Sequence, residues 1–161
     1  MARMEIRGFD EIELQLTKLA DPELAKDVVM AGAQPVADEI RKSLEGLPED
    51  KFRRLGKDEV FTGVPKNQKK DLLDNMGIAP PDVDYDGNTN TKIGFHKYGS
   101  IPTKKYPKGV PNQLLARAIE SGSSVRKKTP FIRKAVNKSK KLAEAEMQKK
   151  LDEKIEIIMK G

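Results

Sequence analysis

The chain has 161 residues, of which 37% are hydrophobic and 35% charged, and it carries a formal net charge of +6. This size and composition predict one domain, residues 1–161, with a modest core and long solvated helices, and they argue against a multidomain enzyme. Because the chain has no cysteine and only one histidine, His96, disulfides and thiolate metal sites are excluded, and we expect no cofactor and no structural metal.

The first predicted elements are two consecutive helices. Apolar residues at helical spacing predict a helix from Phe9 to Leu19. Asp21 and Pro22 then provide a cap and a first-turn proline for a second helix, which Gly46 ends. Pro35 falls inside this second helix and is expected to kink or split it. The charged stretch after it, residues 48–59, is expected to be an exposed connection with Phe52 and Leu55 turned inward.

The middle of the chain reads as short strands with interruptions. Residues 59–64, EVFTGV, form a β-rich run, residues 65–73 favour a short helix, and residues 75–81 favour a brief extended segment stopped by two prolines. Residues 86–88, Asp-Gly-Asn, have turn chemistry, and residues 89–95 alternate as a half-buried strand does. Residues 100–109, SIPTKKYPKG, predict a long exposed loop.

The C-terminal part predicts a short helix and a long one. Pro111 opens the short helix and Gly122 stops it, while Thr129 as N-cap and Pro130 as first helical residue begin a helix over residues 130–159. At 1.5 Å per residue this helix is about 40 Å long, so part of it must lie against another subunit or remain solvated. Its predicted apolar face consists of Ile132, Val136, Ala143, Met147, Leu151, Ile155 and Ile158. The fold class is therefore α+β: two N-terminal helices, a small mostly antiparallel sheet with a long loop, a short helix and a long C-terminal helix.

No residue pattern indicates catalysis. Glycine-rich phosphate loops are absent, and His96 is expected to be an exposed or strand-edge residue rather than a catalytic base. Asp82, Asp84 and Asp86 have the spacing of a calcium loop, but Ile93 stands where an EF-hand requires glutamate, so a solvated acidic turn is the better interpretation.

Basic residues cluster around the start of the last helix. The cluster consists of Arg126, Lys127, Lys128, Arg133, Lys134, Lys138, Lys140 and Lys141. It is interpreted as a solvated helix face, with contact to a DNA backbone as the alternative, although aromatic residues for stacking are scarce. No apolar run has the length of a signal-peptide core or membrane span, so we expect a soluble intracellular protein with no membrane contact.

The order of these features resembles a phage family. The helical pair is followed by a strand region ending TKIGFHKYG and by a lysine-rich loop. After the loop come VPNQLLARAIESGSS, KKTPFIRKA and a long terminal helix. This arrangement resembles the tail-completion or head-tail joining family of long-tailed double-stranded DNA bacteriophages and prophages, often described as minor tail components. The residues that match the family's motif are Glu120, Ser121, Gly122, Ser123, Pro130, Phe131, Ile132, Arg133, Lys134 and Ala135. Lys134 replaces a second proline, and Ser121 a bulkier residue. The likeness runs along essentially the whole chain and is sharpest from Ile93 to Ala135.

The motif also has a physical interpretation. Gly122 permits the turn that ends one helix, Pro130 sets the backbone angle that begins the next, and Phe131 is expected to enter the core. Glu120 and Arg133 are expected either to form a structural ion pair or to be separately solvated.

The resemblance implies a structural virion protein of the phage neck or tail, made in the host cytoplasm, and not an enzyme. It implies a ring, expected to be hexameric, that joins the head-closure (stopper) layer to the tail terminator or tail tube. Two groups are expected to contact a neighbouring subunit or ring, or the genomic DNA in the channel: Lys104, Lys105 and Lys108 in the loop, and Arg126, Lys127 and Lys128 in the turn.

Two other functions stay open on the sequence. A small basic DNA-binding accessory protein is the alternative to the structural subunit, because of the positive charge around residues 126–141. An enzyme with a minimal acidic site at Asp82, Asp84 and Asp86 is a weaker third interpretation.

Overall fold

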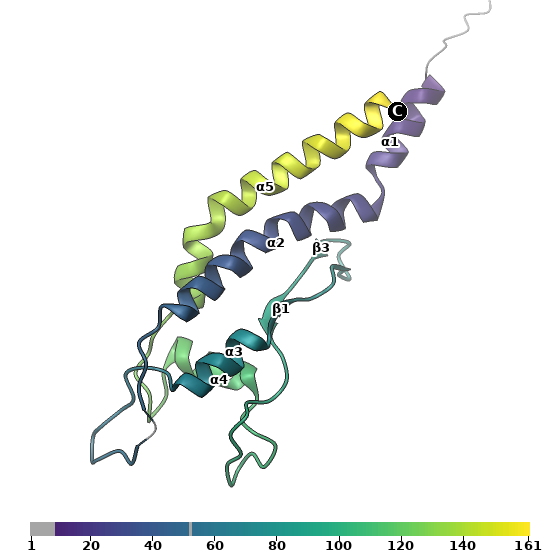
Figure 1. Ribbon diagram of the computed structural model, residues 1–161. Helices are drawn as coiled ribbons and strands as arrows, with labels where there is room; N and C mark the ends of the chain where they lie inside the picture. Colours follow the sequence, from purple (N-terminus) through teal and green to yellow (C-terminus); the bar gives the residue numbers. More distant parts are fainter. Residues whose placement is uncertain (1–8, 52) are drawn as a thin grey trace, which may run out of the picture.

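The computed structural model describes residues 9–51 and 53–161 and confirms the α+β class (Figure 1). Within these residues the helices are α1 (Phe9–Leu19), α2 (Pro22–Glu45), α3 (Lys66–Asp74), α4 (Asn112–Ser121) and α5 (Ile132–Lys160). The strands are β1 (Met76–Ile78), β2 (Asp82–Val83), β3 (Thr89–Asn90) and β4 (Ile93–Phe95). Phe52, expected to turn inward, lies outside the described residues.

Two long helices form an arm. In Figure 1, α2 and α5 run side by side in opposite directions, and α1 extends the arm beside the end of α5. The shorter helices and β1 form a lobe at the other end of the arm, from which two loops project, and the rest of the hairpin runs from the lobe along α2, where β3 lies. Gln15 Nε2 donates to the Met159 carbonyl at 3.5 Å, and this contact ties α1 to the last turn of α5.

Helix α2 begins and ends where the sequence predicts. The Asp21 side chain accepts a hydrogen bond from the Glu23 N–H at 3.0 Å, Pro22 occupies the first turn, and Gly46 follows the last residue. Of the kink or split expected at Pro35, the split is wrong, because α2 continues through this residue without interruption. A proline removes one intrahelical hydrogen bond, and packing along α5 holds the helix together on both sides of it.

The buried face of α5 agrees with the predicted one in part: Ala143 is buried, and Ile132, Met147, Leu151, Ile155 and Ile158 are half-buried. Ala135, Ser139 and Ala143 are buried at four-residue spacing, whereas Val136 is 41% exposed. The buried residues are small, which lets α5 approach α2 closely. A Cβ added to Gly32 of α2 would lie 2.4 Å from Met147 Cγ. The two helices therefore pack closely through small side chains along this part of α5, and Ala135 and Ser139 are the buried residues that the apolar pattern did not include.

The β region is one interrupted hairpin rather than one sheet. β1 pairs with β4 and β2 with β3, both antiparallel, and residues 79–81 and 91–92 separate the two ladders. Pro80 and Pro81 have no N–H to donate, so the ladder stops there. The hairpin turns at residues 84–88, where Gly87 has a positive φ of 83°. The predicted strand over residues 89–95 is thus split into two.

The predicted strand over residues 59–64 is wrong. These residues make only isolated bridges, Phe61 with Arg126 and Val64 with Glu49. Asp58 has a φ of 66°, and a Cβ on Gly63 would lie 2.4 Å from the Pro48 carbonyl oxygen. The segment therefore contacts two loops, one at Glu49 and one at Arg126, and does not pair with a strand.

The core lies in the lobe, where the end of α2 meets the short elements. Its most deeply buried side chains are Leu44, Val64, Leu72, Asn112, Ile119 and Phe131. Residues 100–109 contain no helix or strand, which agrees with the predicted loop.

Candidate functional site

The connection between α4 and α5 is built around Gly122 and a tight turn. Gly122 ends α4 with a φ of 78°, and a Cβ there would lie 3.0 Å from the Lys128 nitrogen. Ser123 and Arg126 exchange backbone hydrogen bonds, and the Thr129 N–H donates to the Ile119 carbonyl at 2.8 Å. The chain therefore folds back on α4 before α5 begins.

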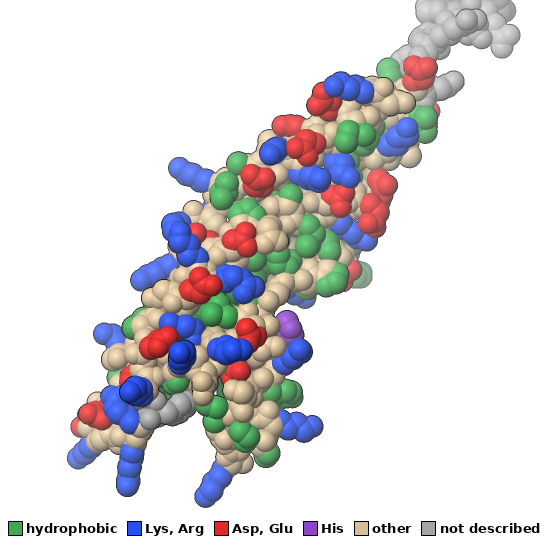
Figure 2. Space-filling view, in the orientation of Figure 1, with side chains coloured by type: hydrophobic (Ala, Val, Ile, Leu, Met, Phe, Trp, Pro, Cys, Tyr) green, Lys and Arg blue, Asp and Glu red, His purple; other side chains and the backbone are tan. Residues whose placement is uncertain are grey.

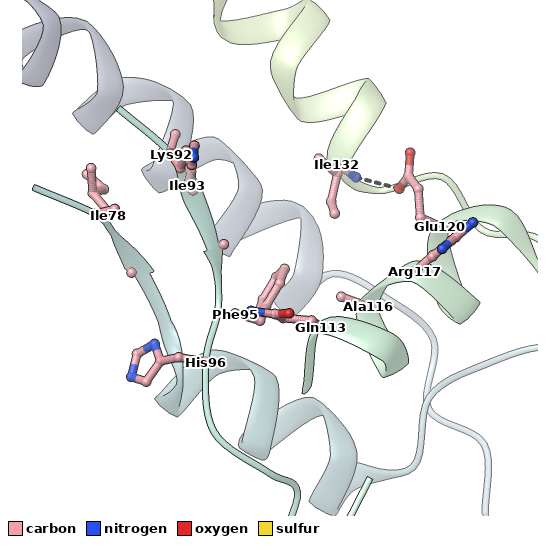
Figure 3. A pocket seen from close by; sticks show the side chains of 13 residues that line it. Ile78, Lys92, Ile93, Phe95, His96, Gln113, Ala116, Arg117, Glu120 and Ile132 are labelled. Carbon is pink, nitrogen blue, oxygen red and sulfur yellow. Dashed lines mark hydrogen bonds between the residues drawn. The ribbon is translucent and has the colours of Figure 1, made fainter. Parts of the chain in front are cut away.

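Glu120 caps α5 from the neighbouring helix. Its Oε2 accepts a hydrogen bond from the Ile132 N–H at 2.8 Å (Figure 3), and its Oε1 accepts one from the Arg133 N–H at 3.1 Å. The first N–H groups of a helix have no partner within the helix and favour negative charge. The Glu120 carboxylate thus provides both the hydrogen-bond acceptors and the negative charge that the start of α5 favours.

This arrangement corrects the predicted start of α5. The helix begins at Ile132, so Pro130 precedes it, and the Thr129 hydroxyl donates to the Lys127 carbonyl at 3.4 Å instead of capping. The ion pair between Glu120 and Arg133, one of the two alternatives expected for them, does not form. Glu120 binds the backbone N–H of Arg133, and no ion pair between the two side chains occurs in the described structure.

Phe131 holds the same joint from inside the core. It is 1% exposed, and its ring centroid lies 6.3 Å from that of Phe95 at an interplanar angle of 59°. The Ser43 hydroxyl donates to the Phe131 carbonyl at 3.2 Å. The joint therefore connects α4, α5, α2 and β4.

Arg126 is a buried structural residue. Only 8% of it is exposed, and its guanidinium donates to the Gly63 carbonyl at 2.6 Å and to Gln68 Oε1 at 3.0 Å. It also lies over the Phe61 ring, 5.8 Å from the centroid. Burial lowers the pKa of Arg126 from its ordinary value. Arg126 is thus removed from the predicted basic surface, whereas Lys127 and Lys128 are exposed on the turn.

The loop of residues 100–109, here named the lysine loop, is fixed at its base. The Asp71 carboxylate accepts from the Ser100 N–H at 2.8 Å and from its hydroxyl at 2.9 Å, and the Gly99 N–H donates to the Val110 carbonyl at 2.8 Å. Lys104, Lys105 and Lys108 are exposed beyond this base. Figure 2 shows basic side chains projecting from the loops at this end of the molecule. The loop therefore presents positive charge on an anchored support.

A groove of about 610 Å³ opens between the hairpin and α4 (Figure 3). β1 and β4 form one side, α4 forms the other, and Ile132 closes one end. Lys92, His96 and Arg117 are exposed at its margin. Glu120 also lines the groove, so the carboxylate that caps α5 forms part of its wall.

The groove could have been suspected from glycines in the strands. Gly77 and Gly94 are direct cross-strand partners, so neither places a side chain on that face of the ladder. Glycine inside a strand often marks a place where another chain or ligand approaches closely. The sequence, however, does not determine the register that pairs Gly77 with Gly94.

The acidic turn organises its own backbone. Asp84 Oδ1 accepts hydrogen bonds from the Asp86 N–H at 3.1 Å and the Asn88 N–H at 2.8 Å. These are the contacts of a side chain that stabilises a turn. Across residues 9–51 and 53–161, no group of three or more acidic, histidine or cysteine residues is placed to hold a metal ion.

Apolar side chains are exposed at the far end of the arm, where α1 meets the last turn of α5. This end of the arm, here named the arm end, carries the exposed side chains of Ile12, Leu14, Leu16, Ile157 and Met159. Each of these side chains is more than half exposed, and Ile157 reaches 68%.

Comparison with protein-family models, with curated proteins and with solved structures finds no match. None of the helices in the described part of the chain combines the length and apolar content needed to cross a bilayer.

Proposed function

We propose that the protein is a structural subunit of the neck or tail of a long-tailed double-stranded DNA bacteriophage or prophage. Copies of the chain close into a ring, expected to be hexameric, between the head-closure layer and the tail terminator or tail tube. Support comes from the sequence resemblance at Glu120, Gly122 and Phe131, three residues that together build the α4–α5 joint. The joint fixes the direction in which the arm leaves the lobe.

The observation that carries the proposal is the arm end. An isolated monomer leaves the aliphatic side chains of Ile12, Leu16 and Ile157 in water, although exposed apolar groups commonly mark contact surfaces. A subunit of an assembly covers such residues with a neighbour. The lysine loop lies in the lobe, so the apolar and the basic surfaces occupy different parts of an elongated molecule.

Deleting the gene from the phage or prophage that encodes it tests the proposal. We expect filled heads and finished tails to accumulate unjoined, and the wild-type gene supplied in trans to restore virions. A variant with Ile12→Glu and Leu16→Glu should fail to restore them, because charge on the arm end prevents assembly. Normal virions after the deletion would overturn the proposal.

The lysine loop provides a second comparison within the same system. Reversing Lys104, Lys105 and Lys108 to glutamate should lower the yield of joined particles, because the loop loses its positive charge. The control reverses three exposed lysines on α5, Lys140, Lys141 and Lys149, and should leave the yield near that of the wild type. Equal yields for the two triple variants would exclude a partner contact through the loop.

The DNA-binding alternative is favoured by one observation, the exposure of Lys127, Lys128 and Lys134 around the start of α5. Phosphate contacts release counterions, so binding to duplex DNA would weaken steeply as salt rises. Retention of duplex DNA that depends strongly on salt, together with a protein that stays monomeric, would favour this function. The burial of Arg126 removes one of the cations on which it relied.

A further inference from the structure

Two glycines line the strand side of the groove between the hairpin and α4. Gly77 and Gly94 face each other across β1 and β4, and a Cβ added to Gly94 would meet no atom within 4 Å. The space at Gly94 is open, whereas a Cβ added to Gly77 would lie 3.7 Å from Cε1 of the His96 ring. The space beside Gly94 can therefore admit a side chain of another segment.

Cations stand at the margin of the groove. Lys92 and Arg117 are exposed there, and neither takes part in an ion pair within residues 9–51 and 53–161. The carboxylate of Glu120 is already bound to the first N–H groups of α5. The groove thus combines an apolar interior with a positive margin, which is suited to an apolar segment that carries acidic residues.

α1 is a segment of that kind. Ile12 and Leu16 lie one turn apart on one face and are 52% and 60% exposed. Glu11 and Glu13 flank Ile12 and are also exposed. At 1.5 Å per residue the helix is about 16 Å long. An amphipathic helix that places aliphatic residues in a groove and acidic residues at its margin is a common mode of recognition.

We propose that α1 of one copy docks in the groove of a second copy, with Ile12 and Leu16 inside and Glu11 and Glu13 beside Lys92 and Arg117. This inference rests on the proposed function, because it names the contact that joins neighbouring subunits.

The two surfaces lie apart in one molecule. In Figure 1, α1 is at the far end of the arm, whereas β1 and α4, which line the groove, are in the lobe. A contact between different surfaces of identical chains is heterologous, and such contacts generate rings when the rotation closes.

The chain contains no cysteine, so single thiols can test the contact directly. A full-length Leu16→Cys variant is mixed with a Gly94→Cys variant under oxidising conditions. We expect the mixed disulfide dimer to exceed the control yield by about tenfold, since docking brings the two thiols together. The control replaces Leu16→Cys by Leu142→Cys, another half-exposed leucine, on α5. Equal yields from the two mixtures would overturn the docking contact.

Filling the groove provides an independent readout. Gly94→Leu should weaken self-association by about tenfold, because the added side chain occupies the place of the docked one. Gly94→Ala, with a smaller side chain in the same open space, should retain most of the association. Circular dichroism verifies that both variants fold. If Gly94→Leu misfolds, Arg117→Glu takes its place, and mixing it with Glu13→Lys should restore association.

The outcomes separate this contact from the proposed function. If the wild-type chain associates but Gly94→Leu associates equally well and the thiols do not link, α1 docking is overturned and the structural role stands. If the wild-type chain remains monomeric at every concentration, the ring itself is overturned and the contact with it.

Discussion

The Glu120 carboxylate accepts hydrogen bonds from the N–H groups of Ile132 and Arg133, and it thereby caps α5 from a different helix. Twelve residues separate Glu120 from Ile132, so the cap forms only when the intervening turn has folded. Because α5 is also one half of the arm, this cap helps to fix the angle between the lobe and the arm, together with the Phe131 ring in the core and the Ser43 hydroxyl.

Replacing Glu120 by glutamine should destabilise the fold by about 1–2 kcal/mol. The amide loses the negative charge at the helix N-terminus and has one acceptor oxygen where the carboxylate uses two. Urea denaturation measures the change in the free energy of unfolding. Glu144→Gln, on the exposed side of α5, is the matched control and should change it by less than about 0.5 kcal/mol. Equal effects of the two substitutions would mean that the cap has no energetic role.

Arg126→Met should destabilise the protein by about 3 kcal/mol, although it replaces a charged residue in a basic turn. The Gly63 carbonyl and the Gln68 side chain lose their donors in a buried place. Lys127→Met, one residue away and exposed, should have an effect below about 0.5 kcal/mol. Thermal and urea unfolding of both variants checks the contrast. If Arg126→Met were as stable as the wild type, the buried hydrogen bonds of Arg126 would not contribute to the free energy of unfolding.

Gly109→Ala should disrupt the base of the lysine loop. Gly109 has a φ of 97°, and an added Cβ would lie 1.8 Å from the Gly99 carbonyl oxygen, so the backbone must move. A loss of about 3 kcal/mol or more is expected for strain of this size. Gly94→Ala, in open space, serves as the control. Hydrogen exchange at the Gly99 amide should accelerate in the first variant only, and unchanged exchange would contradict the geometry.

Stability should depend on the ionisation of Asp50. Hydrogen bonds from the Thr62 N–H and from Arg53 lower the pKa of this carboxyl below its ordinary value of 3.8. A group with a lowered folded-state pKa stabilises the protein above the unfolded pKa, and this contribution is lost as pH falls through the folded value. The difference in urea midpoint between the wild type and Asp50→Asn should therefore shrink in acid. A difference that stays constant with pH would contradict the prediction.

The sequence predicted the helices well because their signals are local. Asp21 and Pro22 at the start of α2 and Gly122 at the end of α4 act within a few residues, and the structure places the helix boundaries beside them. The interrupted hairpin also follows from a local cause, the missing N–H groups of Pro80 and Pro81, but the interruption passes to the partner strand, residues 89–95, only through the pairing of the two.

The rest depended on contacts between distant residues. Thr129 and Pro130 are ordinary signals for a helix start, yet Glu120 caps α5 two residues later because α4 folds against it. Arg126 belongs to a basic run in the sequence, and only the position of Gly63 shows that it turns inward. The groove requires Gly77 to pair with Gly94, and sequence spacing does not determine that register.

The mass of the full-length protein in solution tests the central claim most directly. Native mass spectrometry and multi-angle light scattering, over a range of protein concentrations, report the number of copies in each assembly. The account predicts a closed oligomer of defined copy number, expected to be a hexamer, and its dissociation when Ile12 and Leu16 are replaced by glutamate. A chain that remains monomeric at every concentration, or whose association is unaffected by those two substitutions, would contradict it.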